Sequence, residues 1–210
     1  MSTQHPTSTT TAEPDDKPTV HHWTHDYDLV HLDDDAWEII RLVAAARSAS
    51  YEEDETTDVL LGDPDTEQKH VTGVAGEVAT GLALDIPVLE TLDLTVSAKG
   101  DDGVDLVVRD GPFSETKIDI KTYWGTPTGS PPQLLVEREK AEEAPADAYI
   151  KCQVWDSEWA IVHGWTTQER LLNEGWVEGP PQWQQQNWTM TAEMLDPIET
   201  LDASDVGWQW

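Results

Sequence analysis

The chain has 210 residues and a formal net charge of −30, which arises from 42 acidic and 12 basic residues. Its single cysteine, Cys152, excludes an internal disulfide and any zinc site with several cysteines. No apolar run approaches the length of a membrane span, and the N-terminus lacks the features of a signal peptide. We therefore expect a cytoplasmic protein with no membrane partner and a buried, inert thiol.

The acidic residues are spread through the whole chain rather than gathered in one tail. This distribution favours a protein adapted to a high-salt cytoplasm, such as that of halophilic archaea and the viruses that infect them. At molar salt the Debye length is about 3 Å, so the self-repulsion of an acidic surface is largely screened. Because counterion release is also weak there, the acidity does not exclude a nucleic-acid partner.

The composition divides the chain into a tail and one domain. Residues 1–22 are rich in Ser, Thr, Pro and Asp, and we predict a disordered N-terminal tail. Residues 23–210 form the single predicted domain, with a core at about 70–165 and a Trp-rich C-terminal extension that offers a surface for a homodimer. Three histidines near the boundary are metal-ligand types, but their surroundings fix no geometry; they are His21, His22 and His25.

Two amphipathic helices are predicted in the first half of the chain. Acidic residues 33–35 cap the first helix, whose apolar positions are Ile39, Ile40 and Val43. The second helix spans about 70–84, and its apolar stripe consists of Val71, Val74, Ala75, Val78 and Leu82. Gly73 and Gly76 lie inside this helix and predict the close approach of another backbone. The acidic segment 52–67 is predicted to be an exposed loop.

The apolar period changes to two after residue 92, which predicts strands at 92–96, 103–108 and 117–121. The turn signal Asp110-Gly111-Pro112 joins the last two strands. Further elements are predicted downstream: a short strand and helix within 134–144, strands near 148–155 and 159–165, a helix from Gln168 capped by Thr166 or Thr167, and a short final helix near 191–202. This order predicts an α/β fold.

Alternation along the third strand places Asp119 and Lys121 on one face and Ile118 and Ile120 on the other. An antiparallel hairpin centred on Pro112 pairs Asp105 with Asp119, so their side chains share a face. Two facing carboxylates repel each other, and a divalent cation such as Mg²⁺ resolves the repulsion. The alternative is that both acids face solvent in a very acidic protein and that Lys121 is a surface lysine paired with Asp119.

Three segments together resemble the PD-(D/E)XK nuclease superfamily. They are Gly76-Glu77 on the second helix, the segment from Gly100 to Leu106, and the strand Ile118-Asp119-Ile120-Lys121-Thr122. The resemblance covers about residues 70–165 and implies a restriction-endonuclease-like core, in which helices flank a central mixed β-sheet in the order αβββαβ. Val104 departs from the family's pattern, which has a proline at this position.

The resemblance also implies a metal site. Asp105, Asp119 and the backbone carbonyl of Ile120 would bind Mg²⁺, or Mn²⁺ as a substitute, and Glu77 would hold an outer-shell water or a second ion. The metal would lower the pKa of a bound water and polarise a phosphoryl oxygen. Lys121 would orient that water or neutralise the charge that develops on the phosphate.

With these roles, the chain is expected to be a magnesium-dependent nuclease that hydrolyses DNA, as an endonuclease rather than an exonuclease. Two alternatives remain open. One is a nuclease of branched DNA or RNA, and the other is a catalytically silent module that binds nucleic acid or a protein partner. The presence of Asp105, Asp119 and Lys121 argues against the silent module.

Other residues carry weaker signals. Tyr123 and Trp124 follow the lysine and either stack on a base or, as we favour, pack in the core. His163 has the chemistry of a proton shuttle, although a structural histidine is the favoured interpretation.

The charge of −30 predicts that folding requires high salt, because few basic residues offset the acidic surface. Thermal unfolding followed against KCl should give midpoints that rise up to about 2 M, far beyond the range in which simple screening is incomplete. A midpoint that stays constant across this range would contradict the assignment to a high-salt cytoplasm.

Overall fold

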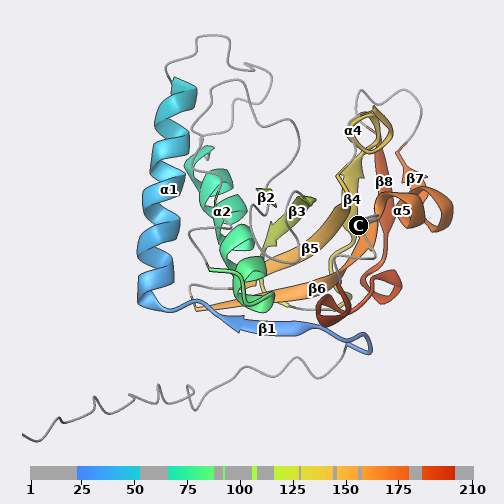
Figure 1. Ribbon diagram of the computed structural model, residues 1–210, viewed down its shortest axis with the longest axis horizontal. Helices are drawn as coiled ribbons and strands as arrows, with labels where there is room; N and C mark the ends of the chain where they lie inside the picture. The colour runs from blue at the N-terminus through green and yellow to red at the C-terminus, as the bar shows by residue number, and fades with distance from the viewer. Residues whose placement is uncertain are drawn as a thin grey trace, which may run out of the picture.

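A mixed five-stranded sheet forms the centre of the fold (Figure 1). The structure, a computed structural model, describes residues 23–52, 66–87, 92, 106–107, 116–127, 129–143, 146–155, 158–179 and 186–201. Across the sheet the strands lie in the order β1 (Asp28–His31), β6 (Trp159–Thr167), β5 (Ala148–Trp155), β3 (Lys117–Trp124) and β2 (Leu106–Val107). Strands β3 and β5 run parallel, and the other neighbouring pairs are antiparallel.

Two helices cover one face of this sheet, and a smaller sheet packs against the other face (Figure 1). The helices are α1 (Asp34–Glu52) and α2 (Thr66–Ala83). The smaller sheet has the order β4 (Leu134–Glu137), β8 (Asn187–Met190) and β7 (Trp176–Glu178). It is accompanied by α4 (Arg138–Glu143), α5 (Gln168–Glu174) and two 3₁₀ turns, η2 (Ala192–Met194) and η3 (Ile198–Thr200). The predicted α/β class with a mixed sheet is confirmed.

Buried apolar side chains form two clusters, one on each side of the main sheet. The first lies between the sheet and the two long helices, and its members include Ile40, Val78, Ile118, Ile150 and Val162. The second lies between the sheet and the smaller sheet, and its members include Leu134, Tyr149, Leu171 and Met190. Because both faces of the main sheet are covered, β5 is buried along almost its whole length.

The helix starts follow the capping signals in the sequence. The backbone N–H of Ala36 donates to Asp33 Oδ1 at 2.8 Å, which caps α1 as predicted. At the start of α5, the backbone N–H of Arg170 donates to Thr167 Oγ1 at 3.2 Å, so Thr167 is the cap rather than Thr166. These local hydrogen bonds satisfy backbone donors that have no partner inside the helix.

Helix α2 lies very close to β3 at Gly76. A Cβ built on Gly76 would lie 1.9 Å from Thr122 Oγ1 and 2.9 Å from Thr122 Cβ. Only a glycine permits this approach, so a close contact is confirmed at Gly76, although it is made to a side chain of β3 and not to a backbone as predicted. The same prediction is wrong for Gly73, because a Cβ there would meet nothing within 4 Å.

A β-bulge interrupts the pairing of β5 with β6. Lys151 pairs with Gly164 and Cys152 pairs with Val162, so His163 is the extra residue of the bulge. Gly164 has a φ of 132°, and a Cβ on it would lie within 2.4 Å of the Asp196 backbone oxygen. The bulge therefore requires glycine, and it lets His163 reach Gln153 on β5.

Several predicted elements differ from the structure. The final helix near 191–202 is wrong: η2 and η3 take its place, separated by Pro197 and by a backbone bridge between Trp165 and Asp196. The predicted exposed loop at 52–67 is wrong at its ends, because residue 52 belongs to α1 and residues 66–67 belong to α2, and its remainder lies outside the described residues. Leu82 is 39 % exposed rather than part of the buried stripe of α2. Strands β1, β7 and β8 were not predicted.

Other predictions fall outside the described residues: the tail at 1–22, most of the strand at 92–96, and the hairpin turn at 110–112. In the part of the chain that the structure describes, no helix has the length and apolar character needed to cross a membrane. Trp159 and Trp165, which lie at the end of the predicted core, are buried within the chain.

The contact between α2 and β3 predicts opposite effects for two glycine substitutions on one helix. Gly76→Ala should lower the free energy of unfolding by about 1–3 kcal/mol, because its methyl group overpacks against Thr122. Gly73→Ala should raise it by up to about 1 kcal/mol, because alanine favours the helix and has open space around it. Chemical denaturation of both variants measures the two shifts, and equal signs would contradict the contact.

Candidate functional site

Asp119 and Lys121 form an ion pair on one face of β3. Lys121 Nζ lies 2.6 Å from Asp119 Oδ1. Ile118 and Ile120 point to the other face, where they join the core under α2. The sequence prediction that the acid and the lysine share a face is therefore confirmed.

Asp119 is only 1 % exposed, so the alternative in which this acid faces solvent is wrong. Although Lys121 Nζ is near, no hydrogen bond of acceptable geometry reaches Asp119 Oδ1. A buried carboxylate oxygen with one cationic neighbour and no hydrogen-bond donor fits a ligand for a hard cation.

The hairpin register agrees with the sequence prediction. Leu106 pairs with Ile118, and Val107 pairs with Lys117. This is the register of a hairpin centred on Pro112. Asp105, the predicted partner of Asp119, lies outside the described residues.

The structure pairs Glu77 with Arg47 rather than with Asp119. Arg47 on α1 donates to both carboxylate oxygens of Glu77, at 2.6 Å and 2.8 Å. Glu77 is buried, and it belongs to the helix that covers the face of β3 opposite Asp119 and Lys121. Bidentate pairing with arginine is a strong interaction for a buried carboxylate. Among the predicted site residues, Asp119 and Lys121 are thus brought together, and Glu77 has a separate partner.

A pocket of about 650 Å³ lies beside this ion pair, between α2, β3 and β4. Its lining comes from both faces of β3 and contains three lysines and two aromatic residues: Gln68, Lys69, Thr72, Gly73, Ile120, Lys121, Thr122, Tyr123, Trp124, Leu135 and Lys151. Ile120, whose carbonyl is a predicted metal ligand, is part of this wall. The volume falls in the range typical of sites for small organic ligands.

Lys151 is a pocket residue that sequence reasoning missed. It is the Cα partner of Lys121 across the parallel pair of β3 and β5. It is 6 % exposed, and burial is the main cause that lowers the pKa of Lys151 to about 8, with a further contribution from the charge of Lys121. The signal was present in the sequence, because a lysine in the middle of an apolar strand rarely lacks a role.

A chain of hydrogen bonds crosses the same face of the sheet beyond Lys151. Gln153 Nε2 donates to the Gly125 carbonyl at 2.6 Å, so Gln153 Oε1 accepts from His163 Nε2 at 3.1 Å. His163 Nδ1 then accepts from His25 Nε2 at 3.1 Å. His163 Nδ1 therefore accepts and His163 Nε2 donates, which assigns a neutral ring to His163. Burial is the main cause that lowers the pKa of His163 to about 3, and His25 and Lys151 lower it further.

These observations make His163 a structural histidine, as the sequence analysis favoured, because it is 1 % exposed and bonded on both ring nitrogens. The favoured core position of Tyr123 is wrong, since this side chain is 50 % exposed at the pocket. Trp124 is 36 % exposed, lines the pocket and lies edge-on to the buried Trp37 of α1. Cys152 is a buried free thiol, as predicted.

Among the described residues, no three His, Cys, Asp or Glu side chains come together as a metal-binding group. Comparison with known proteins found no family model, no curated protein and no solved structure that matches the chain.

The neutral state of His163 predicts a pH-dependent stability. The folded state holds the pKa of His163 far below the ordinary value of 6.5, so below that pH the unfolded chain binds a proton that the folded chain does not. The contribution of neutral His163 to the free energy of unfolding is therefore fully present above pH 6.5. It decreases as the pH falls below this value, by up to about 1.4 kcal/mol per pH unit.

The variant His163→Gln keeps a hydrogen-bonding side chain but does not titrate. Denaturation curves from pH 6.5 down to about pH 5 should show a smaller loss of stability for this variant than for wild type, while the two profiles run parallel at higher pH. Identical slopes below pH 6.5 would show that His163 does not carry this effect.

Proposed function

We propose that the chain is a magnesium-dependent nuclease that hydrolyses phosphodiester bonds of DNA. The observation that carries the proposal is the pair of Asp119 and Lys121, in which a buried carboxylate and an ammonium 2.6 Å apart lie beside a pocket of ligand size. An acid that binds a cation and a lysine that contacts the phosphate are both needed next to the reacting group.

The arrangement of elements supports a restriction-endonuclease-like core. Helix α2 precedes the antiparallel hairpin of β2 and β3, and the chain then passes through α4 to β5, which runs parallel to β3. Apart from β4, the described elements from α2 to β5 follow the αβββαβ order. Strand β4 is an addition to that order, since it lies between β3 and α4 and pairs in the smaller sheet.

In this proposal the buried carboxylate of Asp119 on β3 is a ligand of the cation. Continuing the observed register by one residue pairs Asp105 with Asp119, which would supply the second carboxylate. The Ile120 carbonyl is the proposed third ligand. Mg²⁺, when bound, supplies the Lewis-acid chemistry that makes the phosphate susceptible to attack by water.

Lys121 acts on the substrate rather than on the cation. Its side chain is partly exposed and lines the pocket, whereas the Asp119 side chain is almost wholly buried. An ammonium in this position neutralises negative charge that develops on the phosphate oxygens. The ion pair with Asp119, at 2.6 Å, holds the Lys121 ammonium at the pocket wall.

One observation favours a second function, a catalytically silent module that binds nucleic acid. Arg47 engages both oxygens of Glu77, so a role for Glu77 beside the cation would require this pair to separate. Under the silent alternative, the same pocket binds nucleic acid and no bond is broken. The two functions differ in a single measurement, because only the nuclease converts plasmid DNA to nicked or linear products.

The nuclease proposal predicts that wild-type protein cleaves supercoiled plasmid in the presence of Mg²⁺ at molar KCl. Lys121→Ala should reduce the single-turnover rate by roughly 10²–10³-fold, the loss expected for one donor that stabilises the transition state. Asp119→Asn should lose cleavage and also lose calorimetric binding of Mg²⁺, because it removes the charge of the buried ligand.

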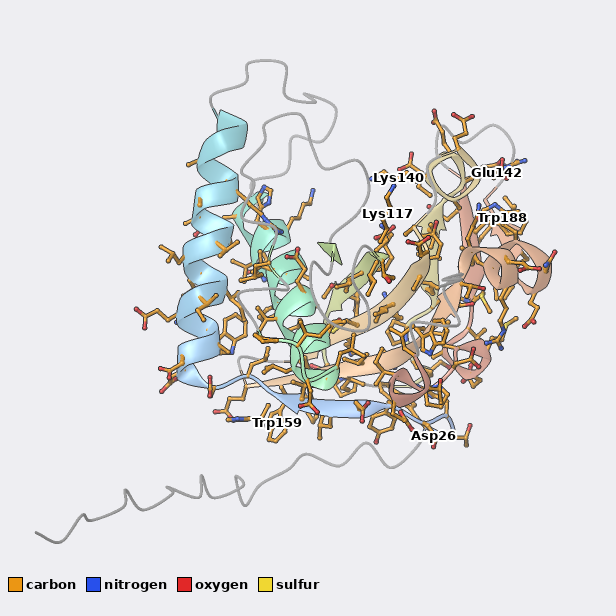
Figure 2. The ribbon with its side chains drawn as sticks, in the orientation of Figure 1. Asp26, Lys117, Lys140, Glu142, Trp159 and Trp188 are labelled. Carbon is orange, nitrogen blue, oxygen red and sulfur yellow. The ribbon has the colours of Figure 1, made fainter. Side chains whose placement is uncertain are left out.

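Lys117→Ala is the matched control, since Lys117 lies at the exposed start of the same strand (Figure 2) and its loss changes the net charge equally. This variant should cleave at the wild-type rate. Lys121→Ala leaves Asp119 buried without its partner, so the rates are compared at a temperature at which thermal unfolding shows every variant folded. Binding of DNA without any cleavage by wild type would favour the silent module, and equal rates for wild type and Lys121→Ala would remove Lys121 from the site.

A further inference from the structure

The charge of Lys151 has no balancing partner in the part of the chain that the structure describes. Lys121 is neutralised by Asp119 at 2.6 Å, but none of the observed ion pairs includes Lys151. Two titratable groups act on Lys151. Lys121 repels it, and Cys152 offers no negative charge, because burial raises the pKa of this thiol to about 12. A buried ammonium without a partner is costly, so its retention indicates a ligand.

The surroundings of Lys151 fit an anion larger than a simple halide. Lys151 and Lys121 are partners on adjacent strands and line the same pocket, to which Lys69 of α2 also contributes. Lysine is a common ligand of phosphate. Phosphate carries more negative charge than chloride, and its several oxygen atoms can each accept a hydrogen bond, so it suits a site with more than one lysine. The pocket, at about 650 Å³, has room for an organic phosphate.

We propose that this pocket binds a phosphate group and that Lys151 is its buried cationic ligand. The inference extends the proposed function, because it names a second phosphate contact beside Lys121, but it rests on the pocket and on Lys151 rather than on cleavage. The phosphate has two sources that share this chemistry, a nucleotide and free phosphate. Tyr123 and Trp124 at the pocket offer aromatic faces on which a base stacks, which favours the nucleotide.

The test is a calorimetric titration of the full chain with inorganic phosphate in about 2 M KCl, where diffuse attraction between charges is screened. Wild type should show saturable binding. Lys151→Met should weaken it by roughly tenfold or more, the loss expected for a hydrogen bond to a charged group. Lys117→Met, which removes the same charge from the exposed start of β3, should bind like wild type.

Thermal unfolding shows whether Lys151 serves to bind phosphate or to stabilise the fold. Because the buried ammonium has no ion-pair partner among the described residues, Lys151→Met should unfold at the wild-type temperature or higher although it binds phosphate more weakly. If Lys151→Met does not fold, Lys151→Gln keeps a polar group and replaces it in the titration. Absence of saturable binding by wild type, or equal binding by the Lys151 variant, would overturn the proposal.

Titration with thymidine monophosphate and with thymidine identifies the source of the phosphate. Tighter binding of the nucleotide than of inorganic phosphate, with the difference lost in Tyr123→Ala, assigns the phosphate to a nucleotide. Equal affinities assign it to free phosphate, and either result supports the pocket. A chain that binds phosphate through Lys151 but never cleaves DNA would refute the nuclease proposal and leave this inference standing.

Discussion

The main sheet is covered on both faces, and this constraint governs the remaining features of the structure. Helices α1 and α2 bury one face, so the polar side chains of β3, β5 and β6 must lie on the other, which the smaller sheet covers. Asp119, Lys151, Gln153 and His163 are consequently buried polar residues. Burying a polar group is costly unless it has a partner. Asp119 has an ion pair, and Gln153 and His163 have hydrogen bonds. For Lys151, the proposed partner is a bound phosphate.

The contact between α2 and β3 determines where a ligand can enter. Gly76 allows the helix to approach Thr122 so closely that no side chain fits between them. Three residues earlier, Gly73 has open space and lines the pocket. Two glycines on one helix therefore serve opposite purposes: Gly76 closes the interface, and Gly73 leaves it open. The pocket lies where this interface ends, within reach of Lys121 and Lys151.

The local charge of the pocket is opposite to that of the whole chain. The protein has a net charge of −30, yet three of its 12 basic residues line one pocket: Lys69, Lys121 and Lys151. At molar salt the net charge has little effect beyond about 3 Å, whereas charges in direct contact with a buried ligand are screened much less. Short-range placement, and not net charge, thus decides whether this acidic protein is suited to bind an anion.

The sequence by itself determined what depends on neighbouring residues: the two long helices, the caps Asp33 and Thr167, the strands of the core, and the shared face of Asp119 and Lys121. Hydrophobic period and capping chemistry act over a few residues, so they can be read without the fold. Only the tertiary structure decided the smaller sheet, the pairing of Glu77 with Arg47, and the placement of Lys151 in a pocket. Each of these joins segments distant in the chain, and the period of one segment carries no information about which other segment will cover it.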